Sequence, residues 1–135
     1  MNENSELHGT LALVRPDLEN ARLNQSGEIG VITYIDTQDE VFMSFRNGVE
    51  GRYSPDDLMQ LKDRDQIFPE LKNYGDLDTD DYKDLYKISL LQDMGRSTDI
   101  LRALEIAGNN PAVWDKTLVP VSDRMTVRHE LSFSR

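Results

Sequence analysis

Few side chains in this sequence are suited to acid–base or metal chemistry. Imidazole is available only at His8 and His129, and the absence of cysteine excludes disulfides, thiolate nucleophiles and cysteine-based zinc sites. A serine nucleophile would need a histidine and a carboxylate beside it, but no G-x-S-x-G elbow occurs. The phosphate-cradling loops G-x-x-x-x-G-K and G-x-G-x-x-G are also absent. We therefore expect neither catalysis nor a bound cofactor.

The densest group of acids, residues 76–84 (DLDTDDYKD), resembles a calcium-binding loop. Loops of the EF-hand kind require Gly at the sixth position and a bidentate Glu at the twelfth, where this chain has Asp81 and Lys87. A metal site is therefore not expected. Instead, we expect Asp78 or Thr79 to cap a helix whose acidic first turn suits the helix dipole.

The elements that would position a binding site are clearest between residues 26 and 61. Residues 31–35 and 41–45 have the two-residue period of strands, and the polar connection 37–40 favours an antiparallel hairpin between them. In the first run, this alternation places Val31, Thr33 and Ile35 on one face and Ile32 and Tyr34 on the other.

A second hairpin is predicted at Asn47 and Gly48. A type I′ turn needs positive φ at both central residues, and Asn followed by Gly tolerates this best. The turn is expected to pair residues 41–46 with 49–53, so that three strands form a meander.

Two flanking segments complete this region. Residues 54–57 (SPDD) predict an N-cap and the start of a short helical turn that carries Leu58 and Leu61. Upstream, residues 11–14 predict a short strand, and residues 16–27 form a polar loop long enough to cross the mouth of a small barrel.

Together these features resemble the small SH3-like barrels, and among them most closely the KOW-type and mind-bomb-type modules. The resemblance covers residues 9–62 through the patterns G-x-x-G-x-I-x-x-I, V-x-x-x-F-x-N-G-x-x-G-x-Y and D-L-x-x-L. The matching positions are Gly27, Gly30, Ile32, Ile35, Val41, Phe45, Asn47, Gly48, Gly51, Tyr53, Asp57, Leu58 and Leu61. The resemblance implies a five-stranded barrel that binds peptides, proteins or nucleic acid. It implies a ligand groove at Tyr34, Phe42, Arg46, Asn47, Arg52 and Tyr53.

The second half of the chain is expected to be helical. An apolar stripe predicts a helix over residues 79–94, ended by Gly95, and an antiparallel neighbour over residues 97–108 with Ser97 as its cap. A third, short helix is expected to begin after Asn110. Within it, Trp114 is expected to plug the space between helices and barrel.

Two further elements are predicted around these helices. A short helical turn is expected after Pro69 and is expected to end at Gly75. Apolar and polar residues alternate over residues 124–133, which predicts a C-terminal strand that returns to the sheet and places His129 on its apolar side. The predicted fold is therefore α+β, with an SH3-like antiparallel β-barrel at 9–62. A two- to three-helix extension and a C-terminal strand follow at 63–135, packed on the barrel as one unit.

The formal net charge of -10 is spread along the chain. Residues 8–62 hold five basic and nine acidic side chains, and residues 63–135 hold ten and fourteen. Because nucleic-acid binding needs clustered Lys and Arg, nucleic acid is not the expected partner. No apolar run approaches the length of a membrane span, and the polar, acidic start is unlike a secretory signal, so we expect a cytoplasmic protein.

The leading hypothesis is a non-catalytic protein-binding or regulatory module that uses the barrel surface. Two alternatives remain open. An acidic inhibitor that mimics nucleic acid would gather Asp and Glu on a single exposed face. A small hydrolase would bring His129 together with converging carboxylates in a deep pocket.

Overall fold

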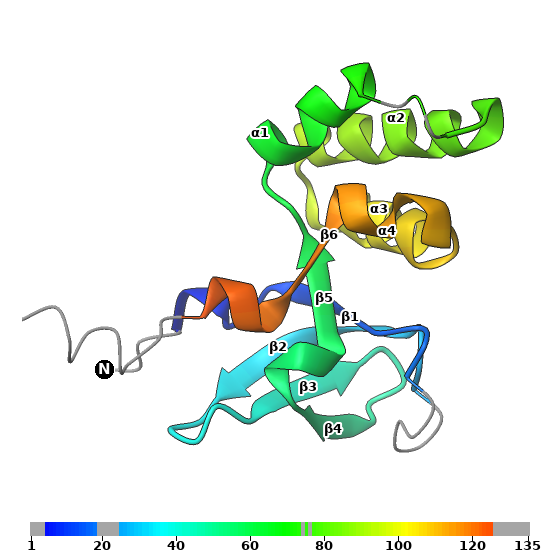
Figure 1. The fold of residues 1–135 in the computed structure, drawn as a ribbon. Coiled ribbons are helices and arrows are strands. Elements are labelled where there is room, and N and C mark those ends of the chain that lie inside the picture. Colours follow the sequence, from blue (N-terminus) through cyan, green and yellow to red (C-terminus); the bar gives the residue numbers. More distant parts are fainter. Residues whose placement is uncertain (1–4, 19–24, 74, 76, 126–135) are drawn as a thin grey trace, which may run out of the picture.

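Six antiparallel strands form one sheet, on which a layer of helices is stacked (Figure 1). This computed structural model describes residues 5–18, 25–73, 75 and 77–125. The strands are β1 (Leu11–Val14), β2 (Ile29–Ile35), β3 (Val41–Phe45), β4 (Glu50–Tyr53), β5 (Leu58–Leu61) and β6 (Leu118–Pro120). Their order across the sheet is β4-β3-β2-β1-β5-β6. The predicted α+β class is confirmed, but the edge strands β4 and β6 do not pair with each other, so the barrel is not closed.

Both predicted hairpins are confirmed, because β3 pairs antiparallel with β2 and with β4. The predicted type I′ turn is wrong. Only Gly48 has positive φ, at 83°, while Asn47 does not. The N–H of Gly48 donates to the carbonyl of Phe45 at 2.9 Å, and Asn47 Oδ1 accepts from the N–H of Val49 at 3.1 Å. The hairpin therefore uses a longer loop in which glycine alone takes the left-handed conformation.

The helical turn predicted to carry Leu58 and Leu61 is also wrong. Only Pro55–Asp57 form a 3-10 turn (η3), which Ser54 caps by accepting from the N–H of Asp56 at 3.4 Å. The next residues form β5, because β1 on one side and β6 on the other supply its backbone partners. Neither β1 nor β6 adjoins this segment in sequence, so the preference for a strand comes from tertiary pairing.

The helical layer contains α1 (Arg64–Ile67), α2 (Thr79–Met94), α3 (Ser97–Gly108) and α4 (Trp114–Thr117), with 3-10 turns η1 (Ser5–Leu7), η4 (Phe68–Lys72), η5 (Pro111–Val113) and η6 (Val121–Arg124). The two long helices match the sequence prediction. Asp78 caps α2 by accepting from the N–H of Asp81 at 2.9 Å, and Gly95 ends it at φ 79°. The cap of α3 is Arg96, not Ser97, and the carboxylate of Asp99 accepts from its N–H at 3.2 Å.

The connector and the chain end depart from the predictions in smaller ways. The turn expected after Pro69 begins at Phe68 and ends at Lys72, before Gly75. The predicted strand over residues 124–133 lies, except for its first two residues, outside the described residues, as does His129. Among the described residues, no helix has both the length and the apolarity needed to cross a membrane.

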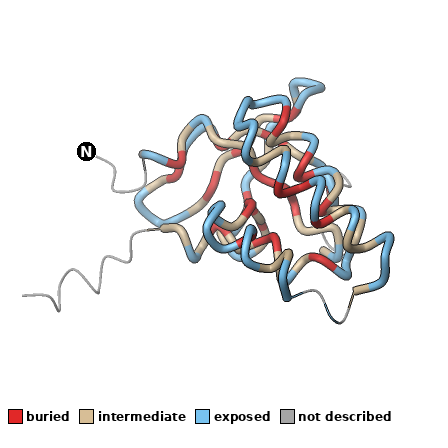
Figure 2. Tube along the Cα trace, turned by 90° about the horizontal axis from the view of Figure 1, so that it is seen from above, coloured by how far each residue is buried: buried red, intermediate tan, exposed pale blue. Residues whose placement is uncertain are grey.

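Two apolar clusters make up the core, and Figure 2 marks the buried positions of the chain in red. Strand β1 separates the clusters, since Ala12 and Val14 belong to one and Leu13 to the other. Helix α3 approaches this strand closely, because a Cβ on Gly108 would lie 3.2 Å from Leu13 Cδ2. The expected plug, Trp114, is only partly buried against the helical cluster, and its indole N–H donates to the carbonyl of Ala107 at 2.7 Å.

Candidate functional site

The helices pack on one face of the sheet, here called the outer face, and cover only part of it. Helix α3 packs on β1, on β2 and on β5. Farther along the sheet, Tyr34 of β2 remains 47% exposed, and Phe42 of β3 and Arg52 of β4 are directly opposed in register. This uncovered part of β2, β3 and β4 is where three of the predicted site residues meet.

A β-bulge at Thr33 places Tyr34 on this outer face. Ile32 pairs with Met43 and Tyr34 pairs with Phe42, so Thr33 is the additional residue on β2. Its hydroxyl donates to the carbonyl of Phe42 at 3.1 Å.

Because of the bulge, the predicted alternation of β2 is wrong. Ile32 and Ile35 both point into the core, while Thr33 and Tyr34 are both exposed. Ile35 therefore lies on the face of Ile32, and not on the face of Thr33 as the period of two predicted.

The aromatic side chains border a groove of about 840 Å³, which we call the sheet groove. Its lining includes Thr33, Tyr34, Asp36, Phe42, Glu50 and Arg52. The ring centroids of Tyr34 and Phe42 are 6.3 Å apart, and the ring of His8 lies 5.3 Å from that of Tyr34. The volume falls within the range of small-molecule and peptide side-chain pockets.

His8 is attached to β2 through its ring nitrogen. The Nε2 atom of His8 accepts a hydrogen bond from the N–H of Ile35 at 3.1 Å. An accepting Nε2 requires the neutral imidazole with its proton on Nδ1. The contact ties the chain before β1 to the end of β2, where the ring of His8 lies against that of Tyr34.

Carboxylates outnumber cations around the sheet groove. Arg52 pairs with Glu40 at 3.7 Å, and Asp36 and Glu50 add two more negative charges to the lining. Asp36 also holds the hairpin, because its Oδ1 accepts from the N–H groups of Gln38 and Glu40, each at 2.9 Å. The groove therefore combines an apolar aromatic surface with a negative rim.

Tyr53, another predicted site residue, is buried and does not line the groove. Its hydroxyl donates to Oε1 of buried Gln25, and its ring meets Phe45 edge to face at 6.4 Å. Burial raises the pKa of the Tyr53 phenol, and the charges of Glu28 and Asp57 raise it further. This side chain supports the sheet and is closed to a ligand.

Arg46 and Asn47 lie at a different place from the aromatic pair. They border a smaller hollow of about 320 Å³ between the second hairpin and α3, together with Glu28, Leu101 and Glu105. The predicted set is therefore divided among the sheet groove, the core and this second hollow. The sequence prediction did not include the groove residues Thr33, Asp36 and Glu50. The signal that could have indicated Glu50 is the register of β3 with β4, which follows from the predicted hairpin.

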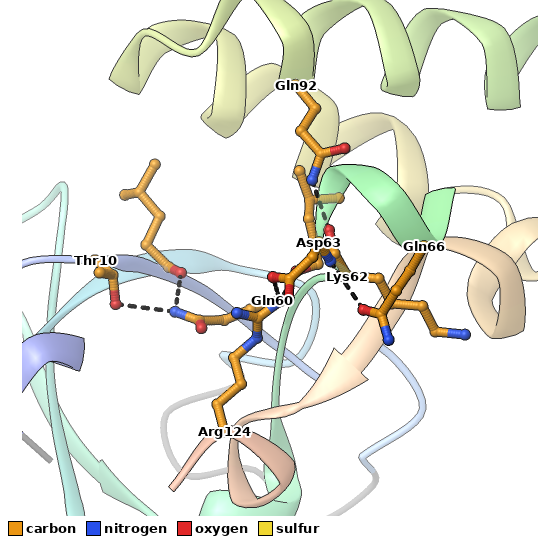
Figure 3. Close-up of polar contacts among 9 residues, drawn as sticks. Thr10, Gln60, Lys62, Asp63, Gln66, Gln92 and Arg124 are labelled. Atoms are coloured by element: carbon orange, nitrogen blue, oxygen red, sulfur yellow. Dashed lines mark hydrogen bonds and ion pairs between the residues drawn. The ribbon is translucent and has the colours of Figure 1, made fainter. Parts of the chain in front are cut away.

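A group of polar contacts connects the sheet to the helices (Figure 3). Gln60 Nε2 donates to Thr10 Oγ1 at 2.9 Å, and Arg124 Nη2 donates to Asp63 Oδ1 at 3.1 Å. Gln92 Nε2 donates to the carbonyl of Lys62 at 2.5 Å, but Gln92 Oε1 and Arg124 Nε are buried without a protein partner. These contacts hold the strand-to-helix crossing between β5 and α1, which indicates a structural role.

The acidic segment is also part of the framework. The carboxylates of Asp81 and Asp84 accept from Nδ2 of Asn110 at 3.0 and 2.9 Å, and thereby join α2 to the cap of η5. Across the described ranges, no cluster of three or more His, Asp or Glu side chains is arranged to hold a metal ion.

Comparison of the chain with protein-family models, with curated proteins and with solved structures found no match. A functional interpretation therefore depends on the chemistry of the groove itself.

Proposed function

We propose that this chain is a non-catalytic binding module, of the SH3-like kind that the sequence resembles, and that its sheet groove binds a protein segment. The observation that carries the proposal is the pair of Tyr34, which is 47% exposed, and half-buried Phe42 on the part of the sheet that the helices leave uncovered. Completing the burial of a half-exposed aromatic ring stabilises a complex by about 1 kcal/mol, roughly half of the value for a fully exposed ring.

The chemistry of the partner follows from the rim. Asp36, Glu40 and Glu50 outnumber Arg52, so a segment carrying Lys or Arg beside apolar side chains suits the groove. A Lys or Arg over the face of an exposed aromatic ring gains about 0.5–1 kcal/mol in addition. The expected partner is therefore a basic, apolar protein segment. The cytoplasmic location expected from the sequence remains part of the proposal.

The nucleic-acid mimic is less well supported. Acids in both layers are paired with cations, as Asp17 is with Arg15, Asp93 with Arg64 and Glu70 with Lys116. Such pairing reduces the continuous negative surface that a mimic would present. The hydrolase alternative depends on His129, which lies outside the described residues.

A displayed peptide library, panned on the wild-type protein, tests the groove. We expect the recovered peptides to combine Lys or Arg with apolar residues and to lose at least tenfold in affinity for Phe42→Ala by titration calorimetry. The Phe68→Ala variant, in which an aromatic side chain 55% exposed on η4 is truncated, is the matched control and should bind as wild type does. Peptides that bind Phe42→Ala and wild type equally would remove the groove from consideration.

A charge reversal tests the contribution of the acidic rim to binding independently of the aromatic pair. Glu50 is exposed and lines the groove, so Glu50→Lys should weaken basic peptides and leave the fold intact. The affinity of wild type for the same peptides should fall as salt is raised. An affinity that changes neither with Glu50→Lys nor with salt would contradict the basic character of the partner.

A further inference from the structure

Helix α2 carries a second apolar face that nothing in the described fold covers. Its inner face buries Leu85 and Ile88, while Tyr86, Leu90 and Met94 are exposed by 50%, 49% and 54%. Residues spaced by four lie on one side of a helix, about 6 Å apart along its axis. These three side chains therefore form a continuous row about 12 Å long, which we call the α2 stripe.

Positive charge accompanies the α2 stripe in a chain whose formal net charge is -10. Lys83 and Lys87 are exposed, and each lies three residues before a member of the stripe. At that spacing their side chains lie beside Tyr86 and Leu90. Asp93, which lies three residues after Leu90, is paired with Arg64 at 2.8 Å. Between Tyr86 and Leu90 the stripe thus has the composition that the sheet groove is proposed to bind, namely apolar side chains flanked by lysine.

The two surfaces cannot meet within one molecule. Helix α3 packs between α2 and the sheet, contacting α2 on one side and β1 on the other. Figure 1 shows α2 and the strands β3 and β4 at opposite ends of the fold. An interaction between stripe and groove must therefore join separate copies.

We propose that the protein self-associates head to tail, with the α2 stripe of one copy docked in the sheet groove of the next. Leu90 and its neighbours would cover Tyr34 and Phe42, whose 6.3 Å ring separation is close to the step of about 6 Å along the stripe. Lys83 and Lys87 would approach the acidic rim. Because the two joined surfaces differ, each added copy presents a free surface, and the assembly grows as an open chain or closes as a ring.

Sedimentation velocity of the full chain provides the test. Wild type should show a weight-average sedimentation coefficient that rises with concentration beyond that of a dimer. Leu90→Ala, which damages the stripe, and Phe42→Ala, which damages the groove, should each remain monomeric when alone. An equimolar mixture of the two should form a dimer and stop. The intact stripe of Phe42→Ala docks in the intact groove of Leu90→Ala, and only the two damaged surfaces are left free.

The matched control is Phe68→Ala, which should assemble as wild type does, and circular dichroism should show that each variant is folded. Lys83→Glu combined with Lys87→Glu should abolish assembly, and adding Glu50→Lys on the mixing partner should restore part of it. Wild type that stays monomeric into the millimolar range would overturn the proposal. So would assembly lost in Leu90→Ala but retained in Phe42→Ala, since that pattern indicates α2 pairing with α2.

This inference rests on the proposed function of the groove, and the two can fail separately. If library peptides bind through Phe42 but wild type is monomeric, only the self-association is wrong. If neither peptides nor copies depend on Phe42, the groove itself is not a binding site.

Discussion

At the scale of single residues, two glycines of the sheet are closely approached by atoms of their neighbours. A Cβ on Gly30 would be 2.8 Å from the carbonyl oxygen of Ser44 and 2.9 Å from Cδ1 of Phe45. A Cβ on Gly51 would be 3.0 Å from both Gln25 Oε1 and Tyr53 Cε2. Backbone and a packed ring cannot yield as a flexible side chain can, so the first site tolerates no added methyl group.

Gly30→Ala should therefore destabilise the protein by about 1–3 kcal/mol, the usual cost of overpacking a core. Urea unfolding followed by circular dichroism measures this change. The control is Gly75→Ala, because no atom lies within 4 Å of the Cβ position there and the backbone is not left-handed. Equal midpoints for the two variants would show that the β2–β3 contact relaxes freely.

Tyr53 gives a prediction that depends on pH. Its pKa is raised by burial, so the folded protein keeps the phenol proton to a higher pH than the unfolded chain does. The stabilisation is fully present below the ordinary tyrosine pKa of about 10 and is lost as pH rises through the raised value.

Tyr53→Phe should cost about 1–2 kcal/mol near neutral pH, because buried Gln25 loses its hydrogen-bond donor. The difference in unfolding free energy between wild type and variant should shrink as pH rises above about 10. Thermal melts of both proteins in a pH series measure it. A difference that stays constant through that range would mean that the phenol does not titrate differently on folding.

At the scale of elements, the bulge in β2 accommodates one additional residue in the strand. Thr33 adds one residue opposite Phe42, and this shift puts Tyr34 outside while Ile35 stays inside. Residues 32–35 (ITYI) are bulky at every position, so their sequence does not show which of these side chains face the core. The bulge could not be predicted from it, and the site residues that it exposes were identified only through the resemblance.

Deletion of Thr33 should convert the bulge into a regular ladder, in which Ile32 and Ile35 stay inside and Tyr34 stays outside opposite Phe42. We therefore expect the deletion variant to stay folded and to bind groove peptides as Thr33→Val does. Thr33→Val is the control, since it removes the hydroxyl bond to the Phe42 carbonyl but keeps the additional residue. Binding that is lost in the deletion variant but kept in Thr33→Val, measured by titration calorimetry, would show that the bulge itself shapes the groove.

The two long helices were predicted well from local sequence, whereas β5, which distant partners define, was not. The caps at Asp78 and Gly95 fix α2 from neighbouring residues alone. Strand β5 depends on β1 and β6, which lie far away in the chain, and β6 is short and contains Pro120. A proline is tolerated there because β6 is an edge strand. Local propensity carries no information about either pairing.

At the scale of the whole molecule, the two apolar clusters share β1 as a common wall. Because Leu13 faces the helices while Ala12 and Val14 face the other cluster, loss of either cluster exposes a side of the same strand. The sheet and the helices are therefore expected to unfold together as one cooperative unit.

Trp114, the single tryptophan, reports on the helical layer and makes this cooperativity measurable. Ile32→Ala removes a fully buried side chain from the sheet cluster and should cost about 2–5 kcal/mol. The midpoint of urea unfolding followed by Trp114 fluorescence should shift by as much as the midpoint followed by circular dichroism. A shift in circular dichroism alone would show that the layers unfold separately.

The position of β1 between β2 and β5 also has a consequence for the order of folding. The β2–β3–β4 meander and the α2–α3 pair join neighbours in the chain, whereas Val14 pairs with Leu58 and Leu61 with Leu118. Closing such long loops costs entropy before the contacts compensate for it. We expect the meander and the helix pair to form early, and the rate of refolding to be limited by the step that brings β1, β5 and β6 together.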